Sequence, residues 1–334
     1  MAAHQLCAAL NLWYNKYNMS SFWQDLPKPF FILAPMDAVT DTVFRRVVAK
    51  AAAPDVFFTE FVNSTSYCSP KGKDSTKNRL LVDGSERHPL VAQIWGTVPE
   101  HFAAMAKELA AMGYDAIDIN MGCPDKNITS RGACSALIET PELAAKIIAA
   151  TKEGGLPVSV KTRIGFRTKK TEEWISFLLQ QNLAALTVHG RTAKEMSKVP
   201  AHWDEIGFAA ELRNKIAPQT IIIGNGDVQN REEGEKLAKE YGLDGIMIGR
   251  GIFHDPFCFE PTKQEHTQEE LFALLHYHLD IFDATWQGAR VFEPLKRFFK
   301  IYINGFPGAH ELRAQLMETR GTDEARAILS GFKS

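Results

Sequence analysis

Eight apolar segments of strand length recur along the first three quarters of the chain, and each ends on a polar or small residue. Most are rich in Val, Ile and Phe and lack a clean alternation with polar positions, which is typical of parallel strands buried on both faces. The pattern predicts eight parallel strands. The segments are FFILAPM (30–36), VFFTEF (56–61), LVAQIWG (90–96), AIDINMG (116–122), PVSVKTRIG (157–165), ALTVHGR (185–191), TIIIGNG (220–226) and GIMIGRG (245–251).

Helical patterns lie between most of these segments and carry signals for the start of a helix. The signals are Thr97 with Glu100, Thr140 followed by Pro141, and Thr171 before EEWISFLL. A strand followed by a helix, repeated eight times, predicts an α/β fold of the (β/α)8 type, the TIM barrel.

The alternative architecture is an open, doubly wound sheet, which requires a Gly-x-Gly-x-x-Gly turn after an early strand. The nearest match begins at Gly224-Asn225-Gly226, but Gln229 occupies the position of the third glycine, and the match lies on the seventh predicted strand. The barrel is therefore the favoured fold.

The pattern changes after Pro261 to helices alone, beginning with a capping box formed by Thr267 and Glu270. A length of 334 residues also allows about two domains at roughly 150 residues each. We predict an N-terminal extension at 1–25, a barrel domain at 26–262 and a helical domain at 263–334. No Gly/Ser-rich linker separates the last two, so the helices are expected to pack firmly on the barrel.

The composition is that of a globular protein. With 45% hydrophobic and 23% charged residues, the chain is neither wholly disordered nor fibrous. Its five cysteines are scattered without Cys-x-x-Cys spacing, so no metal site is predicted and a reduced intracellular compartment fits best. No apolar run approaches the ~18 residues of a membrane span, and the N-terminus lacks the basic start of a signal peptide. We expect a cytoplasmic protein without a membrane segment.

The net charge of −2 argues against a protein that coats nucleic acid with a strong positive field. The charge is nevertheless segregated along the chain. Residues 160–200 hold eight basic and three acidic side chains, a local +5, and residues 286–334 hold eight and five, a local +3. These segments predict a positive stripe beside the barrel mouth, with an ordinary solvated face as the alternative.

Glycine-bearing turns follow the seventh and eighth predicted strands. Gly226 and Asp227 close the first turn, and Gly249 and Arg250 lie in the second. Barrels commonly bind a phosphate at this position through backbone N–H groups, to which Arg250 can add a charge-assisted contact. The alternative is that the glycines only permit tight turns.

Lys161, His189 and Gln93 each end a predicted strand, at the edge where a barrel has its active site. A lysine there can form a Schiff base, hold negative charge on a reduced flavin, or form an ion pair with Asp118. Gln93 can donate and accept hydrogen bonds at once, which suits a flavin or a pyrimidine, but packing is nearly as good an explanation. His189 has a structural alternative of the same kind.

The longest interval between strand ends, 41 residues, follows Asn120 and contains Cys123. The thiol lies over the barrel mouth, where it can act as a nucleophile, donate a proton near neutral pH, or be inert. Lys126 and Arg131 follow in the same loop, as expected of a loop that meets a phosphate backbone, although single charges are usually only solvated.

Together these segments resemble the tRNA-dihydrouridine synthases of the bacterial type, flavin enzymes that reduce uridine in tRNA. The resemblance covers residues 30 to about 320, and its most specific parts are the GCP loop, the HGRT segment and the PGA-x-x-LR tail. The matching segments, in the order of the family, are APMDAVTD, QIWG, DINMGCPDKN, RGACSAL, VKTRIG, TVHGRT, IIIGNGD, GIMIGRG and FFKIYINGFPGAHELR.

The resemblance implies an FMN cofactor, NADPH as its reductant, and tRNA as the substrate. The implied FMN residues are Pro35, Met36, Asp37, Gln93, Lys161, His189, Asn225, Gly226, Asp227, Gly249 and Arg250. A uridine is flipped out of the tRNA, FMN N5 gives hydride to its C6, and Cys123 delivers a proton to C5. The implied substrate contacts are Asn120 and Arg163 with the uracil, and Lys126 and Arg131 with the tRNA. The helical domain is expected to bind the tRNA. No obligatory protein partner is expected, and the protein is expected to be a monomer.

The chain departs from the family pattern at two places. Cys134 occupies a position that is commonly glycine, and MSKVPAHWDE replaces the usual Tyr- and Gly-containing stretch after HGRT.

Three other functions are alternatives to the synthase. They are an FMN barrel enzyme for a free small molecule, similar to a dihydroorotate dehydrogenase, a Schiff-base aldolase using Lys161, and a tRNA-binding module with a vestigial flavin site.

Overall fold

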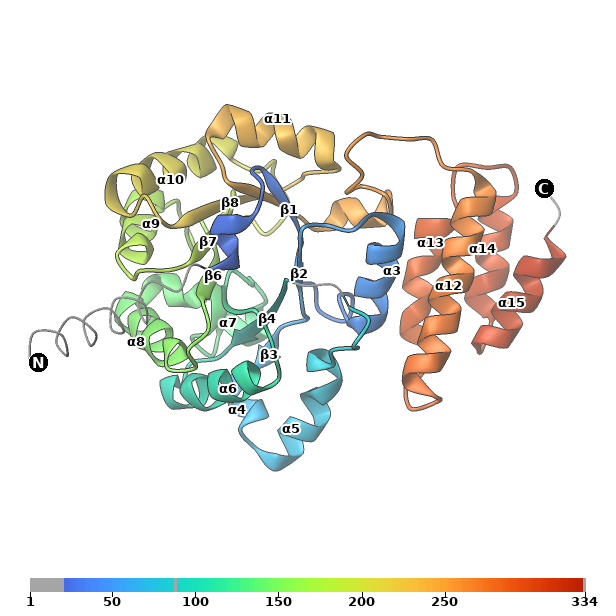
Figure 1. The fold of residues 1–334 in the computed structure, drawn as a ribbon, viewed down its shortest axis with the longest axis horizontal. Helices are drawn as coiled ribbons and strands as arrows, with labels where there is room; N and C mark the ends of the chain where they lie inside the picture. The colour runs from blue at the N-terminus through green and yellow to red at the C-terminus, as the bar shows by residue number, and fades with distance from the viewer. Residues whose placement is uncertain (1–20, 87–88, 333–334) are drawn as a thin grey trace, which may run out of the picture.

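The computed structural model describes residues 21–86 and 89–332. Within them, nine parallel strands form one sheet in the order β2-β1-β9-β8-β7-β6-β5-β4-β3, and an additional pairing between β2 and β4 closes it into a barrel (Figure 1). The predicted TIM barrel is confirmed. The strands are β1 (Phe30–Leu33), β2 (Val56–Phe58), β3 (Val62–Asn63), β4 (Leu90–Trp95), β5 (Ala116–Met121), β6 (Val158–Arg163), β7 (Ala185–His189), β8 (Ile221–Asn225) and β9 (Gly245–Ile248).

Helices between the strands cover the outside of the barrel, as a right-handed βαβ chain requires. They are α3 (Thr42–Ala52), α6 (Pro99–Ala111), α8 (Pro141–Lys152), α9 (Thr171–Leu179), α10 (Trp203–Ile216) and α11 (Arg231–Tyr241). Shorter turns in the loops are α4 (Ser64–Tyr67), α5 (Pro70–Thr76), η1 (Lys77–Leu80), α7 (Lys126–Thr129), η2 (Cys134–Glu139) and η3 (Arg250–Phe253).

The predicted helix starts are only partly right. The capping signal at Thr97 is wrong, because α6 begins at Pro99 after Val98 and has no side-chain cap. Thr140 does precede the helix that starts at Pro141, but its side chain makes no capping hydrogen bond. Proline at the first helical position, with its fixed φ, therefore marks both starts better than a threonine does.

The strand interiors alternate between two environments. Outward residues pack under the helices, whereas inward apolar residues such as Phe30, Phe58 and Val91 form a separate cluster at the base of the barrel. Towards the carboxyl ends the inward residues become polar, as seen for Gln93 paired with Asp118. An apolar base and a polar upper half place the chemistry at the mouth.

The base of the barrel is closed by the short helix α2 (Phe22–Asp25). Ser21 caps this helix, and Trp23 is fully buried against the rings of Phe30 and Phe58. The segment 21–25 was predicted to belong to an N-terminal extension, but it packs as part of the barrel. Residues 1–20 of that extension lie outside the described part of the chain.

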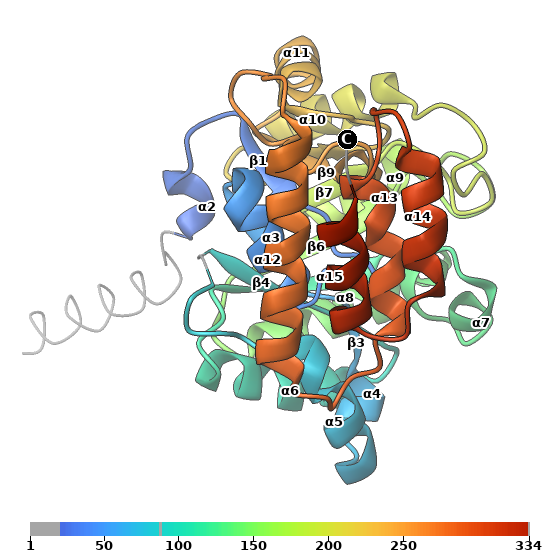
Figure 2. The same ribbon diagram turned by 90° about the vertical axis from the view of Figure 1, so that its right-hand side faces the viewer.

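A layer of helices follows the barrel and lies beside it (Figures 1 and 2). It comprises α12 (Gln268–Trp286), η4 (Glu293–Phe298), α13 (Phe299–Tyr302), α14 (Ala309–Glu318) and α15 (Thr322–Gly331). The capping box at Thr267 and Glu270 is confirmed, with both reciprocal hydrogen bonds present. None of the helices in residues 21–86 and 89–332 combines the length and apolar character needed to cross a membrane.

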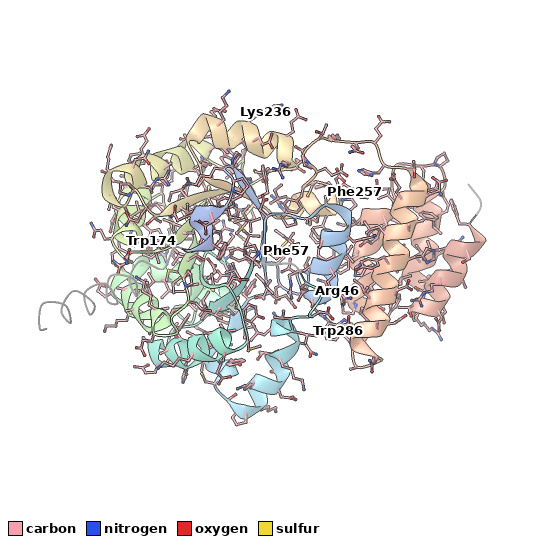
Figure 3. All side chains as sticks on the ribbon, in the orientation of Figure 1. Arg46, Phe57, Trp174, Lys236, Phe257 and Trp286 are labelled. Carbon is pink, nitrogen blue, oxygen red and sulfur yellow. The ribbon has the colours of Figure 1, made fainter. Side chains whose placement is uncertain are left out.

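The helical layer packs on the barrel mainly through α12 and α3. Phe298 stacks on Phe44 with ring centroids 4.6 Å apart, and Arg46 donates a hydrogen bond to Thr285 at 3.2 Å. Figure 3 labels Arg46 and Trp286 at this boundary. An aromatic contact and several polar ones together hold the layer in a fixed position.

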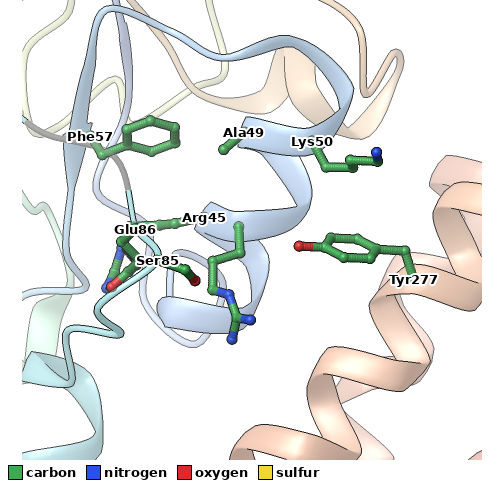
Figure 4. Close-up of a pocket in the computed structure, with 8 residues that line it drawn as sticks. Arg45, Ala49, Lys50, Phe57, Ser85, Glu86 and Tyr277 are labelled. Carbon is green, nitrogen blue, oxygen red and sulfur yellow. Dashed lines mark hydrogen bonds and ion pairs between the residues drawn. The ribbon is translucent and has the colours of Figure 1, made fainter.

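A cavity of 230 Å³ remains at this boundary (Figure 4). Tyr277 reaches towards it from α12, and the opposite wall contains Phe57 and the buried ion pair of Arg45 with Glu86 at 2.7 Å. Because Arg45 also donates to the carbonyl oxygens of Thr40 and Leu81, the pair ties two loops together. The cavity is therefore a feature of the packing between barrel and helices, away from the barrel mouth.

Candidate active site

A cavity of 370 Å³ opens at the carboxyl ends of β1, β6, β7, β8 and β9. Nine of the residues predicted to hold a cofactor line it, although they come from five separate strands. They are Pro35, Met36, Lys161, His189, Asn225, Gly226, Asp227, Gly249 and Arg250. The structure therefore brings together most of the predicted cofactor site.

Asp227 orders the charged rim of this cavity. Its carboxylate forms ion pairs with Arg250 at 2.8 Å and with the buried Arg191, and it accepts a hydrogen bond from the backbone of Ala201 at 3.0 Å. The two guanidinium groups are thereby held side by side at one wall. Arg191 also lines the cavity and was not among the predicted site residues. Its place in the HGRT segment was the signal for it.

Lys161 faces the cavity without a hydrogen-bond acceptor among the described residues. Burial, and then the neighbouring Arg163, lower the pKa of its ammonium to about 8, while the charge of Asp118 opposes this shift. The predicted alternative, an ion pair with Asp118, is not formed at 4.0 Å or less in the described chain. The ammonium is thus an unpaired cation directed at the cavity.

His189 stands beside Lys161 as a neutral imidazole. Burial and the surrounding cations Arg163, Lys161 and Arg191 hold its pKa well below the ordinary value. Arg191 donates to its Nε2 at 3.1 Å, so the proton of the neutral ring resides on Nδ1. His189 can therefore donate one hydrogen bond to a ligand without adding a charge.

Gln93 and Asp37 were predicted cofactor residues, but neither lines the cavity. Gln93 is fully buried, and its amide donates to Asp118 at 2.7 Å and accepts from Asn120 at 2.9 Å. These hydrogen bonds are those expected of the packing role that the sequence left open as an alternative. Asp37 is exposed and pairs with Arg79. Asp37 lies one residue beyond Met36, the last residue after β1 that lines the cavity.

The loop that carries Cys123 is fixed by hydrogen bonds at both ends. Asn120 accepts from the backbone N–H groups of Gly122 and Cys123 at 3.0 and 2.9 Å, and Ser135 donates to the Cys123 carbonyl through its hydroxyl at 2.8 Å. Arg163 donates to the Gly122 carbonyl at 2.7 Å. Cys123 is half-buried and lies close enough to Lys161 for their charges to interact.

The thiol of Cys123 has a buried neighbour, Cys134. A hydrogen bond from Cys134, together with one from the backbone of Asp125, lowers the pKa of Cys123 to about 7, and burial opposes this change. Burial raises the pKa of Cys134 well above its ordinary value. Both cysteines are free thiols. Cys134 has φ +54°, a left-handed conformation in which glycine is strain-free.

Lys126 and Arg131 lie farther out in the same loop. Lys126 begins the short helix α7, which stands at the edge of the barrel (Figure 2), and both side chains are exposed. Neither forms an ion pair with any residue in the described part of the chain. Their positions leave both charges open to solvent at the rim of the mouth.

Residues 32–333 match the family model described as Dihydrouridine synthase (Dus). The chain belongs to the dihydrouridine synthase family. It is 53% identical over 315 residues to the "Probable tRNA-dihydrouridine synthase 2" of Bacillus subtilis (strain 168), covering 94% of this chain and 97% of that protein. It is 52% identical over 316 residues to the "Probable tRNA-dihydrouridine synthase" of Staphylococcus aureus (strain Mu50 / ATCC 700699), covering 94% and 96%.

Among solved structures, the barrel is similar to a 2-naphthoyl-CoA reductase in complex with 2-naphthoyl-CoA, with a TM-score of 0.53. The sequence identity is 10%, and the match covers 68% of this chain and 48% of that one. At this identity the likeness shows a shared fold only. Membership of the dihydrouridine synthase family makes this protein an oxidoreductase.

The lowered pKa of Cys123 in this dihydrouridine synthase gives a pH-dependent prediction. The rate of alkylation by iodoacetamide, followed by mass mapping of the peptide that contains Cys123, should be half-maximal near pH 7, because only the thiolate reacts. In Cys134→Ala the midpoint should rise towards about 8.5, the ordinary thiol value. A midpoint that does not move in this variant would show that Cys134 does not act on Cys123.

Proposed function

We propose that this protein reduces uridines of tRNA to dihydrouridine, with FMN in the 370 Å³ cavity and NADPH as the reductant. The observation that carries the proposal is the free thiol of Cys123 within electrostatic range of the unpaired ammonium of Lys161, which lines that cavity. A proton donor and a cation next to one pocket suit a reaction in which a ring gains a hydride and a proton. The family match supplies the substrate class.

The cavity residues fit FMN in size, charge and shape. A volume of 370 Å³ lies in the range of sites for ligands of about this size. Arg250 and Arg191 offer positive charge for a phosphate, and Gly226 (φ +138°) has a backbone conformation that favours glycine. Lys161 and the Nδ1–H of His189 remain as donors for a flavin ring. Bound FMN supplies the hydride transfer.

Side chains of this protein are proposed to deliver the proton and to hold the loop and the substrate. Cys123, with a pKa of about 7, is poised to deliver its proton to C5 of the uracil at neutral pH. Arg163 uses its Nε and one terminal nitrogen to hold the carbonyl oxygens of Gly122, Thr192 and Met196. Its other terminal nitrogen has no partner in the described residues and is available for a substrate oxygen.

A single experiment on the purified protein tests the proposal. We expect a yellow protein with flavin absorbance that is bleached by NADPH under anaerobic conditions and then reoxidised by unmodified tRNA. Free uridine and orotate should not reoxidise it. Reoxidation by orotate or another free small molecule would instead select the small-molecule barrel enzyme. A colourless preparation that binds no added FMN would select the aldolase or the vestigial tRNA-binding module.

The tRNA is proposed to dock on a basic groove of 410 Å³ in the helical layer. The groove is lined by Lys296, Arg297, Phe299, Lys300, His310, Arg313, Ala314 and Met317. It adjoins the barrel mouth, because Arg297 donates to the carbonyl of Ala38 at 3.1 Å and the ammonium of Lys300 lies 5.6 Å from the ring centroid of Phe253. The exposed side chains of Arg297 and Lys300 suit the phosphates of a nucleic-acid backbone.

Residues 160–200 expose less unpaired positive charge than the +5 of their sequence suggests. Arg163 and Arg191 are buried, and Lys169 and Lys170 form ion pairs with Glu205 and Glu139. Arg167, Lys194 and Lys198 are exposed and remain available to a phosphate backbone. We therefore place most of the tRNA contact on the groove in the helical layer.

Replacing Arg297 and Lys300 together with glutamine should weaken tRNA binding and make it less sensitive to salt. Each lost phosphate contact is expected to reduce the slope of log K against log salt concentration by about 1. The matched control is the pair Lys236→Gln and Lys239→Gln on α11, which removes the same charge from exposed positions outside the groove. Binding titrations over a range of salt concentrations measure both. Equal losses in the two pairs would mean that only net charge matters.

A further inference from the structure

A continuous line of hydrogen bonds runs through the barrel interior from a buried carboxylate to the loop of Cys123. Gln93 donates from Nε2 to Oδ2 of Asp118 at 2.7 Å, and Asn120 donates from Nδ2 to Oε1 of Gln93 at 2.9 Å. Asn120 in turn accepts, on Oδ1, the N–H groups of Gly122 at 3.0 Å and Cys123 at 2.9 Å. Asp118 lies outside the residues assigned to cofactor or substrate.

The strand register brings these residues together. Gln93 and Asp118 are partners across β4 and β5, and Asp118 and Ser159 are partners across β5 and β6. Ser159 donates to the second carboxylate oxygen, Oδ1, at 2.6 Å. Asp118, Gln93 and Ser159 are all at most 1% exposed, and Asn120 is 6% exposed. Water therefore cannot replace any of these hydrogen bonds at low cost.

The Asp118 carboxylate determines which group donates and which accepts in each hydrogen bond along this line. An ionised carboxylate only accepts hydrogen bonds, so the amide of Gln93 must present its NH₂ group to Asp118 and its oxygen to Asn120. Asn120 must then present its own NH₂ group to Gln93, which leaves its oxygen for the two backbone N–H groups. One acceptor at the end of the line thus fixes the orientation of two amides that otherwise have two nearly equivalent orientations.

The charge state of Asp118 is consistent with this role. Burial raises the pKa of Asp118 to about 6, and the hydrogen bonds from Ser159 and Gln93 and the charge of Lys161 oppose the shift. At neutral pH the group is therefore mainly ionised and remains an acceptor only.

We propose that Asp118 is a positioning residue, which acts through Gln93 and Asn120 to hold the backbone at Cys123 in its reactive geometry. The role in turnover rests on the proposed function, in which Cys123 is the proton donor. The positioning itself does not depend on that function. Asp118 is fully buried and does not line the 370 Å³ cavity, so its effect reaches the reaction through the loop.

The substitution Asp118→Asn tests the role with almost no change in volume. It removes an acceptor and adds an NH₂ group to a buried cluster whose neighbours, Gln93 and Ser159, both act as donors. In either orientation of the new amide, at least one buried donor is left without an acceptor. Relief comes from turning the amides of Gln93 and Asn120, which would direct the NH₂ group of Asn120 at the N–H groups of Gly122 and Cys123.

The matched control is Ser159→Ala. This variant also removes a hydrogen bond from the Asp118 carboxylate, but it leaves the bond to Gln93 and hence the direction of the line intact. The readouts are hydrogen exchange of the backbone amides at 120–125, the alkylation rate of Cys123, and the separate rates of flavin reduction by NADPH and flavin reoxidation by tRNA.

In Asp118→Asn we expect at least tenfold faster exchange at Gly122 and Cys123 and an altered alkylation rate. Reoxidation by tRNA should fall at least tenfold in kcat with little change in KM, whereas Ser159→Ala stays within threefold in every readout. If Asp118→Asn does not fold, Gln93→Leu breaks the middle of the line and should give the same faster exchange. Unchanged exchange in the folded variant, or equal effects in Ser159→Ala, would overturn the proposal.

The two hypotheses fail separately. Faster exchange in Asp118→Asn together with full activity of Cys123→Ala would support the positioning role of Asp118 and contradict the catalytic role of Cys123. Protected amides in Asp118→Asn together with an inactive Cys123→Ala would keep the proposed function and remove Asp118 from it.

Discussion

Replacing Cys123 with alanine should reduce dihydrouridine formation by at least about 10²-fold, the range expected for loss of a general acid. FMN should stay bound, because the Cys123 side chain does not line the 370 Å³ cavity. The loop should also keep its shape, since the hydrogen bonds from Gly122 and Ser135 and the N–H of residue 123 involve the backbone and not the thiol. Turnover on unmodified tRNA and flavin absorbance of the purified variant measure the two effects.

Cys134→Ala is the matched control, since it removes the other thiol of the pair. Its turnover should fall only mildly, because Cys134 is fully buried and touches Cys123 but not the cavity. The backbone strain is also unchanged, because alanine at φ +54° is as unfavourable as cysteine. Near-normal turnover by Cys123→Ala would contradict its assignment as the proton donor, and a larger loss in Cys134→Ala would assign that role to Cys134.

The barrel was predictable because its signal repeats. Strands buried on both faces read as apolar runs such as TIIIGNG and GIMIGRG, and eight such runs separated by helical patterns leave few architectures open. Single boundaries were less predictable. The second predicted strand, 56–61, is too long, because β2 ends at Phe58 and the next strand, β3, begins only at Val62. Thr59 and Glu60, the polar residues after β2, are buried like their apolar neighbours, so the burial pattern does not mark the end of β2.

The cavity lining was largely predictable because strand ends converge at the mouth of a barrel whatever their spacing in sequence. Which side chains reach the cavity was not predictable from strand ends alone. Gln93 and Lys161 both end predicted strands, yet the amide of Gln93 is occupied by Asp118 and Asn120, while Lys161 is free to face the cavity. Hydrogen-bond partners on neighbouring strands determine which side chain faces the cavity, and a sequence motif does not contain that information.

The local charge of +5 in residues 160–200 overestimates the positive charge that this segment exposes in the folded protein. Arg191 and Arg163 count towards the basic segment at 160–200, but both are buried and hold other groups. Arginine can make five hydrogen bonds, so it often organises loops and does not then meet a phosphate backbone. The segment 286–334 was the better guide, because Arg297 and Lys300 of the helical groove are exposed, as its local charge of +3 suggests.

Replacing Lys161 with methionine should make the protein more stable and much less active. The folded state lowers the pKa of Lys161 to about 8, below its value of about 10.4 in an unfolded chain. A cation in such a site destabilises the fold. The destabilisation is fully present below pH 8 and fades as the pH rises towards 10.4. Methionine fills similar space without the charge, so the thermal midpoint of the flavin-free protein should rise at pH 7.

Activity should respond in the opposite direction. Without the ammonium, negative charge that develops on the ring of a bound flavin loses the unpaired cation that we assign to it, and flavin reduction by NADPH should slow by about 10²-fold. Lys152→Met is the control, because Lys152 is a partly buried cation on α8 whose pKa is also lowered by burial, far from the cavity lining. It should leave flavin reduction unchanged. Stopped-flow reduction and thermal melts of both variants measure the separation, and a Lys161→Met variant that is destabilised yet reduced at the normal rate would mean that Lys161 holds the fold and not the flavin.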